Sequence, residues 1–165
     1  MHKLYGVIII LVAVIDVVWC QSCPSGFQHH DDSCYSLIRV QASWAEAAVY
    51  CQAIGSHLAY VETASEQTFV EGYLKREEST ITTDGVWIGG LSYLTQNDWL
   101  WGFQGDIIAP THWAPGMPDN THQDQFCIMM YKATSFLWDD VGCFTKQYFM
   151  CELAQATSPG IVVGK

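Results

Sequence analysis

Apolar side chains recur at helical spacing between Ser43 and Gly55, which predicts a helix with one buried face. Ser43 and Glu46 form a capping box, in which the serine accepts from the N3 amide and the glutamate reaches back to the cap. Gly55 predicts the end of the helix, because glycine readily adopts the left-handed conformation there. The residues on the predicted buried face are Trp44, Ala47, Ala48, Cys51 and Ile54.

A second capping box, formed by Thr63 and Glu66, predicts another helix that continues to Arg76. Lys75 and Arg76 lie near its end, where cations interact favourably with the helix dipole. The apolar positions of this helix are Phe69, Val70, Tyr73 and Leu74. The glutamates at 66, 71, 77 and 78 are interpreted as a solvated face rather than as catalytic carboxylates.

Short apolar runs of strand length lie before, between and after these helices. A hairpin is predicted around the polar turn 29–33, between Phe27 and the run 34–38. Further strands are predicted at 57–61, 86–90, 99–102, 126–131 and 148–151. Two helices followed by strands with long loops indicate an α+β fold.

The N-terminal segment has the pattern of a secretory signal peptide. Lys3 precedes an apolar run from 4 to 19 that is too short to favour a membrane-spanning helix. We therefore expect cleavage of residues 1–20, secretion, and no membrane span in the mature chain. A signal anchor is the alternative, which Asp16 and the polar Gln21 disfavour. The domain is predicted over 23–152, and 153–165 as a loose tail.

The formal net charge of −10 argues against nucleic acid and anionic membranes as partners and favours attraction of cations. Seven cysteines are present, and loss of Cys20 with the signal peptide leaves six. Six cysteines allow 15 pairings, among which the sequence alone does not choose. An oxidising compartment favours disulfides over free thiols. The cysteine and histidine spacings do not match a zinc site.

Oxygen-bearing side chains cluster after a loop that is too rich in proline and glycine for regular structure, from Pro115 to Pro118. Carboxylate and amide oxygens are the ligands that hard cations prefer. A solvated acidic loop is the simpler interpretation, and composition alone favours it. The candidate ligands are Asp119, Asn120, Gln123, Asp124, Gln125, Asp139 and Asp140.

Taken together, the motifs from Cys23 to Glu152 resemble the C-type lectin domain, and in detail the perlucins, which are secreted single-domain lectins of shell matrix. The motifs that carry the resemblance are the start 23–27, the helix 44–48 with Cys51, His57-Leu58-Ala59, Trp87-Ile88-Gly89-Gly90, Trp113 with Pro118-Asp119, Cys127, Trp138-Asp139-Asp140, Cys143, and the end 148–152. The resemblance implies two helices packed on small antiparallel sheets, with a long loop region and disulfide staples. The disulfides it implies are Cys23–Cys34, Cys51–Cys151 and Cys127–Cys143.

The resemblance also implies one Ca²⁺ site that binds two neighbouring sugar hydroxyls. Carried over by position, the metal ligands are Asp119, Gln125, Asp139 and Asp140, and the sugar-binding residues are Met117, Asp119, Gln125 and Asp139. Met117 departs from the family pattern, because its thioether is a poor ligand for a hard ion. The family pattern also predicts a cis peptide bond between Met117 and Pro118. An auxiliary Ca²⁺ site is not expected, since Ser92, Gln96 and Phe126 stand where acidic ligands would be needed.

The resemblance implies Ca²⁺-dependent carbohydrate binding, and Pro118-Asp119 resembles the family's galactose-type motif, which implies galactose-like sugars. The expected partners are glycans, in innate immune recognition or shell matrix, and a calcium carbonate surface is a further candidate. The alternative is a C-type lectin-like module that binds protein or mineral with a degenerate Ca²⁺ site. An enzyme is not expected, because no serine, histidine and aspartate combination has a nucleophile signature.

Overall fold

The computed structural model describes residues 23–92, 98–103, 105–109, 112–121 and 124–154. The predicted signal peptide, Gln96, Gln123 and most of the predicted tail lie outside these residues; the last strand itself runs to Ala154. Within the described part of the chain, no helix is long and apolar enough to cross a membrane.

Both helices begin where the capping boxes predict. Helix α1 spans Trp44–Ala53 and α2 spans Ala64–Glu77, and each has both hydrogen bonds of its capping box. Helix α1 buries Trp44, Ala47 and Cys51, whereas Ile54 is 46% exposed. The prediction that Ile54 is buried was wrong, because Ile54 is the C-cap residue and the chain leaves the helix there. Gly55 has a φ of 76°, as expected for the residue that ends the helix.

The strands join into one hydrogen-bonded network. They are β1 (Gln28–His30), β2 (Ser33–Ala42), β3 (His57–Leu58), β4 (Gly85–Ser92), β5 (Trp99–Trp101), β6 (Gln125–Tyr131), β7 (Leu137–Gly142) and β8 (Gln147–Ala154). Their order is β1-β2-β8-β4-β6-β7, with β3 paired to β8 and β5 to β4. All pairs are antiparallel except β4 and β8. Two short 3₁₀ helices, Glu78–Thr80 and Lys132–Thr134, complete the α+β fold.

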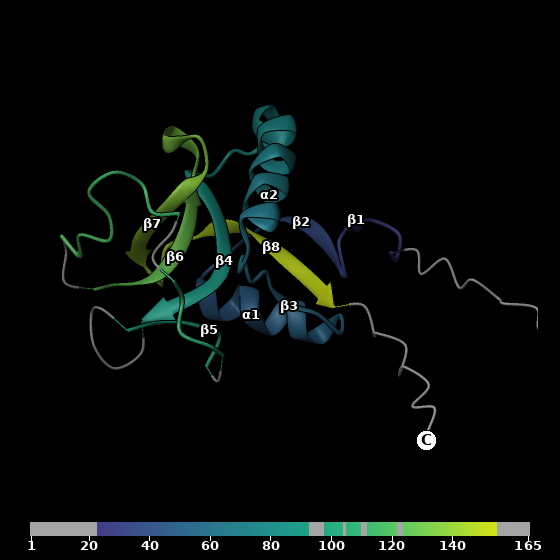
Figure 1. Ribbon diagram of the computed structural model, residues 1–165, viewed down its shortest axis with the longest axis horizontal. Coiled ribbons are helices and arrows are strands. Elements are labelled where there is room, and N and C mark those ends of the chain that lie inside the picture. Colours follow the sequence, from purple (N-terminus) through teal and green to yellow (C-terminus); the bar gives the residue numbers. More distant parts are fainter. Residues whose placement is uncertain (1–22, 93–97, 104, 110–111, 122–123, 155–165) are drawn as a thin grey trace, which may run out of the picture.

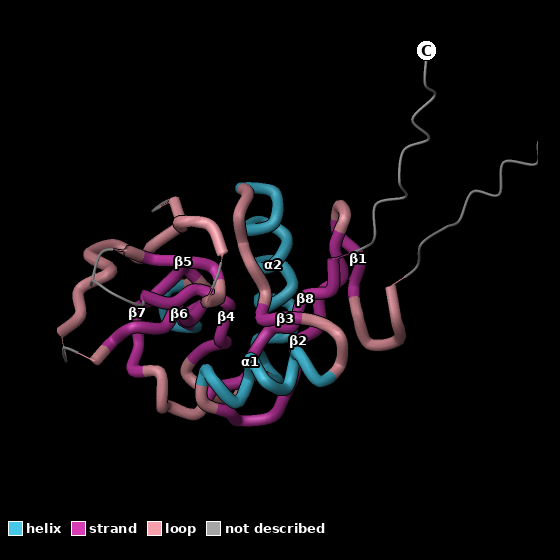
Figure 2. The backbone as a smooth tube through the Cα atoms, turned by 90° about the horizontal axis from the view of Figure 1, so that it is seen from below, coloured by secondary structure: helices cyan, strands magenta, loops and turns pink. Residues whose placement is uncertain are grey.

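Strands β2 and β8 lie between the two helices, which run in different directions (Figures 1 and 2). Alternate residues of the central strands therefore enter two separate core clusters. Val86 and Ile88 of β4 and Met150 of β8 pack in the cluster that contains α2, whereas Trp87 and Phe149 pack in the cluster that contains α1. A sheet covered on both faces explains why these strands are continuous apolar runs rather than alternating ones.

Strand β7 was not predicted, although it carries two of the candidate ligands. Its sequence contains Asp139 and Asp140, and aspartate is depleted in strands because it favours turns and caps. The predicted strand at 57–61 was too long, since β3 contains only His57 and Leu58. The N-terminal hairpin turns more tightly than predicted, at Asp31, whose φ is 48°.

The three disulfides implied by the family resemblance are confirmed. Cys23 is bonded to Cys34, Cys51 to Cys151 and Cys127 to Cys143. The second joins α1 to β8 across a sequence separation of 100 residues. For a loop of this length, chain entropy gives about 4–5 kcal/mol of stabilisation. The third disulfide connects β6 to the end of β7 and so brackets Asp139 and Asp140.

Candidate functional site

The predicted ligands lie on three segments that meet at one end of the sheet, on the left of Figure 1 and far from β1. Asp119 is in the loop that precedes β6, Gln125 is the first residue of β6, and Asp139 and Asp140 are in the middle of β7. Strands β6 and β7 pair antiparallel, with Gln125 opposite Gly142 and Met129 opposite Asp139. The carboxylates of Asp119, Asp139 and Asp140 are called the loop cluster below.

The first part of the loop is attached to the edge of β7 by backbone hydrogen bonds. The Trp138 amide donates to the His112 carbonyl at 3.0 Å, and the Ala114 amide donates to the Trp138 carbonyl at 2.8 Å. A tight turn follows, in which the Met117 amide donates to the Ala114 carbonyl at 2.9 Å. Pro115 and Gly116 occupy its central positions, and the φ of 89° at Gly116 is a conformation that favours glycine.

The next peptide bond, between Met117 and Pro118, is cis, which confirms the prediction. It leads directly into Asp119 and Asn120. Asn120 has a φ of 44°, in the left-handed region that asparagine tolerates better than most residues. The proline-rich loop therefore reaches the ligand positions in an ordered conformation.

The buried carboxylate of Asp140 holds this second part of the loop. The side chain is fully buried, and its two oxygens accept hydrogen bonds from the backbone amides of Asp119 at 2.9 Å and Asn120 at 2.7 Å. A buried carboxylate needs such donors, because desolvation strongly disfavours an unpaired charge. Asp140 thus positions Asp119 relative to β7.

Gln125 and Asp119 make further internal hydrogen bonds. The Gln125 side-chain amide donates to the Asp140 backbone carbonyl at 2.7 Å, and its backbone amide donates to the Asn120 side-chain oxygen at 3.2 Å. The Asp119 carboxylate accepts from the Thr121 amide at 2.9 Å. These contacts tie the end of the loop to both strands.

The surroundings of Asp139 disfavour its negative charge. Burial raises the pKa of this carboxyl, and the negative charges of Asp140 and Asp119 raise it further. The backbone amide of Asp140 acts in the opposite direction. A carboxylate whose negative charge is disfavoured by neighbouring carboxylates favours a bound cation.

The donor types and the charge of the loop cluster fit a divalent hard cation such as Ca²⁺. Met117, which is half-buried beside Asp119, offers only sulfur and does not fit. The described residues contain no group of three or more histidine, cysteine, aspartate or glutamate side chains that already converge as ligands. The three carboxylates of the loop cluster therefore do not form a complete ligand set in this conformation.

The positions expected for an auxiliary Ca²⁺ site carry no acidic residue where the structure describes them. Ser92 is buried on β4, and Phe126 is 36% exposed on β6. Neither side chain supplies a carboxylate.

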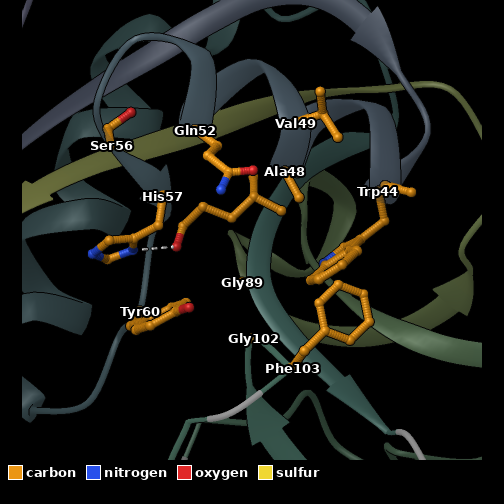
Figure 3. A pocket seen from close by; sticks show the side chains of 12 residues that line it. Trp44, Ala48, Val49, Gln52, Ser56, His57, Tyr60, Gly89, Gly102 and Phe103 are labelled. Atoms are coloured by element: carbon orange, nitrogen blue, oxygen red, sulfur yellow. Dashed lines mark hydrogen bonds between the residues drawn. The ribbon is translucent and has the colours of Figure 1, made fainter.

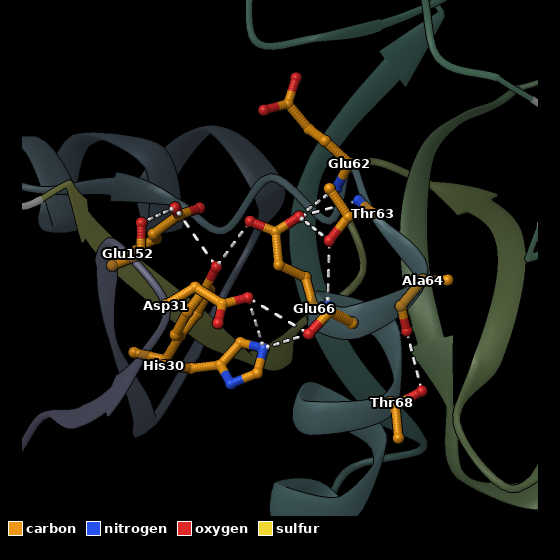
Figure 4. Close-up of polar contacts among 11 residues, drawn as sticks. His30, Asp31, Glu62, Thr63, Ala64, Glu66, Thr68 and Glu152 are labelled. Atoms are coloured by element: carbon orange, nitrogen blue, oxygen red, sulfur yellow. Dashed lines mark hydrogen bonds and ion pairs between the residues drawn. The ribbon is translucent and has the colours of Figure 1, made fainter.

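A second group of carboxylates consists of Glu66 and Glu152 and is called the helix-end cluster below (Figure 4). The capping role of Glu66 was predicted, but sequence reasoning missed Glu152 and its association with Glu66. The Glu66 carboxylate accepts from the Thr63 amide at 2.8 Å and from the Tyr35 hydroxyl at 3.1 Å. Interpreting Glu66 as part of a solvated face was therefore incomplete. Its capping role was predicted from the sequence, whereas its hydrogen bond from the Tyr35 hydroxyl was not.

Glu152 is buried on β8, next to Cys151. One carboxylate oxygen accepts from the Ser33 hydroxyl at 2.6 Å, and the other from the Tyr60 amide at 2.8 Å. The pKa of Tyr35 is raised mainly by burial, with the nearby charges of Glu152 and Glu66 adding to the effect. The helix-end cluster joins the first hairpin, α2 and the last strand.

The structure is a disulfide-stapled α+β domain in which a long loop and β7 bring three carboxylates to one end of the sheet. A family model described as the lectin C-type domain matches residues 40–153, and the chain belongs to this family. Membership confirms the resemblance, the fold class and the prediction that the chain is a lectin domain and not an enzyme.

Perlucin from Haliotis laevigata is 34% identical over 131 residues, which cover 79% of this chain and 82% of perlucin. A solved structure of SPL-1 in complex with GlcNAc is 27% identical, covers 81% of this chain and 96% of that one, and has a TM-score of 0.69. A calcium-independent type II antifreeze protein is 26% identical, with coverages of 82% and 96% and a TM-score of 0.68.

Proposed function

We propose that this protein binds carbohydrate through one Ca²⁺ ion held by Asp119, Gln125, Asp139 and Asp140. The observation that carries the proposal is the loop cluster itself, in which burial and then the carboxylates of Asp140 and Asp119 raise the pKa of Asp139. When bound, Ca²⁺ would offer coordination positions to two neighbouring sugar hydroxyls. Perlucin and the SPL-1 complex with GlcNAc support a sugar ligand.

The residues of the site have different tasks in this proposal. Asp140 is fully buried and holds the loop through the amides of Asp119 and Asn120. Asp119 and Asp139 supply carboxylates that accept hydrogen bonds from sugar hydroxyls. The side-chain amide of Gln125 would contact both the ion and the sugar. Met117 contributes apolar contact only, so the site is weaker than one with an oxygen ligand at this position.

The Pro118-Asp119 pair supports galactose-like sugars as the ligand class. We place the protein outside the cell, after removal of residues 1–20, since three disulfides are typical of an oxidising compartment. Its setting would be innate immune recognition or shell matrix. In a shell matrix, the net charge of −10 is also compatible with a calcium carbonate surface.

A second candidate is a domain that uses the same fold without calcium, binding a protein or mineral surface. Three observations favour it: the sulfur of Met117, the internal hydrogen bonds of the Asp140 carboxylate, and the donation from the Gln125 amide to the Asp140 carbonyl. The similarity to a calcium-independent antifreeze protein points the same way. The two candidates differ in whether binding needs calcium, and this difference can be tested directly.

The test is glycan-array binding of the mature protein in Ca²⁺ and in EGTA. Sugar-dependent binding that EGTA removes, with galactosides among the strongest signals, supports the first candidate. Glycan binding that survives EGTA, or no glycan binding in Ca²⁺, contradicts it and supports the second. Asp32→Ala is a matched control, because Asp32 is an exposed aspartate in the β1–β2 turn.

A further inference from the structure

A hollow of about 390 Å³ lies between α1, β3 and the start of the loop after β5 (Figure 3). It shares no residue with the loop cluster or with the helix-end cluster. Its size is in the range of small-molecule sites in proteins. The lining residues belong to three groups: helix α1, the segment 56–60, and the glycines of β4 and the β5 loop with Phe103.

Aromatic rings form two walls of this hollow. Trp44 and Phe103 meet edge to face on one side, with their ring centroids 5.6 Å apart. His57 and Tyr60 pack together on the other side at 4.3 Å. Figure 3 shows the two pairs separated by the open space, with Gly89 between them. Aromatic rings that line an open space favour a flat ring between them, through stacking and edge contacts.

Two glycines keep the lower part of the hollow free of side chains. A Cβ atom at Gly89 would lie 2.4 Å from the Tyr60 ring, and one at Gly102 would lie 2.3 Å from the Tyr60 hydroxyl. A side chain at either position would therefore displace Tyr60. The glycines allow the tyrosine to lie against the backbone, so this wall is formed before any ligand binds.

The lining is apolar and open to water. None of its residues is an aspartate, glutamate, lysine or arginine, and Phe103 and Val49 are 66% and 65% exposed. Covering such surface is favourable, at roughly 25 cal/mol per Å². A sugar would fit poorly here, because its hydroxyls would lose water without gaining enough hydrogen-bond partners.

Negative charge surrounds the Tyr60 side of the hollow. Burial raises the pKa of Tyr60, and the carboxylates of Glu152 and Glu62 raise it further. The whole chain has a net charge of −10. An anionic ligand is therefore disfavoured. Gln52 provides a polar group, since Figure 3 shows its amide above the opening.

We propose that this hollow is a second binding site, which takes a small, flat aromatic molecule without negative charge and with a hydroxyl that can reach Gln52. The site does not depend on Ca²⁺. Its failure would therefore leave the proposed carbohydrate site untouched, and the reverse also holds.

The test is a titration of the mature protein with 2-naphthol in EGTA, followed by ligand-observed NMR. Saturable one-to-one binding is expected. Phe103→Ser should weaken it by roughly two- to tenfold, which corresponds to the loss of one aromatic pair. Ala48→Phe fills the hollow from α1 and should abolish binding. Phe144→Ser is the matched control, because Phe144 is 91% exposed and lies outside the lining.

The charge of the ligand gives a further check. Naphthalene-2-sulfonate should bind more weakly than 2-naphthol at low salt, and the difference should shrink as salt screens the charges. The proposal is overturned if 2-naphthol does not bind saturably, if Phe103→Ser and Phe144→Ser behave alike, or if methyl galactoside displaces it. Circular dichroism and thermal unfolding of each variant establish that it is folded.

Discussion

The loop cluster and the helix-end cluster contain the same chemical groups but differ in how their charges are compensated. Glu66 and Glu152 accept from hydroxyls and amides on several separate segments, and Glu152 is buried. In the loop cluster, only Asp140 is fully buried, and Asp139 has a raised pKa. The first arrangement stabilises the fold, whereas the second leaves negative charge that a cation can neutralise.

The burial of a carboxylate therefore does not identify its function. Asp140 and Glu152 are both buried and both accept from backbone amides. The difference lies in their donors: those of Asp140 are amides of the loop, whereas those of Glu152 are the Ser33 hydroxyl of β2 and the Tyr60 amide after β3. Mutations in the two clusters should therefore affect different measurements.

The largest effect on stability is expected from Glu152→Ala. The change leaves the Ser33 hydroxyl and the Tyr60 amide without their acceptor in a buried region. We expect a loss of about 2–5 kcal/mol in the free energy of unfolding. Urea denaturation measures it, with Glu78→Ala as an exposed control that should change stability by less than about 0.5 kcal/mol. A loss as small as the control's would show that the helix-end cluster does not stabilise the fold.

The largest effect on the proposed binding is expected from Asp140→Ala. This change removes one ligand and releases the amides of Asp119 and Asn120, so the loop loses its attachment to β7. Ca²⁺ binding should be lost in isothermal titration, whereas Asp32→Ala should bind as the wild type does. Stability should fall by about 1–3 kcal/mol. Equal Ca²⁺ affinities for wild type and Asp140→Ala would contradict the site assignment.

Substitution of Met117 by a residue with an oxygen ligand should increase the affinity of the loop cluster for Ca²⁺. Met117→Gln supplies an amide oxygen, and Met117→Glu supplies an oxygen with negative charge. Both should tighten Ca²⁺ binding, by roughly ten- to a hundredfold if the new ligand contributes like a hydrogen bond to a charged group. The glutamate variant should bind more tightly than the glutamine variant. Titration of both against Met117→Leu, which adds no oxygen, measures the gain, and identical affinities in all three would exclude position 117 from the site.

How much could be predicted from the sequence depended on the distance between interacting residues. The capping boxes at Ser43 and Thr63 join residues three positions apart, and both were correct. The role of Glu152 was missed, because its donors Ser33 and Tyr60 are 119 and 92 positions away. Composition and spacing could not choose the disulfides, and the family resemblance was needed.

The candidate site was also predicted only in part, because some of its contacts join residues that are far apart in the sequence. Motifs named the candidate ligands, whose role in binding stays a prediction, and the cis bond before Pro118 was confirmed. Strand β7 was missed, because the two aspartates proposed as ligands also lower its strand propensity. The hydrogen bonds from the loop amides to Asp140 could not be read from the sequence, since they depend on how the loop folds back.

The smallest effect is expected at Glu46, an exposed carboxylate that a cation compensates. Its hydrogen bonds with Lys146 and with the Ser43 backbone and hydroxyl lower its pKa from 4.5 to about 2. Because the folded-state pKa is lowered, this stabilisation is present above pH 4.5 and is lost as the pH falls towards 2. Glu46→Gln should therefore lower the Tm at pH 6 by at most about 2 °C. Near pH 2 the wild type and Glu46→Gln should unfold at the same temperature in scanning calorimetry. A difference that persists unchanged at pH 2 would show that Glu46 acts through packing and not through its charge.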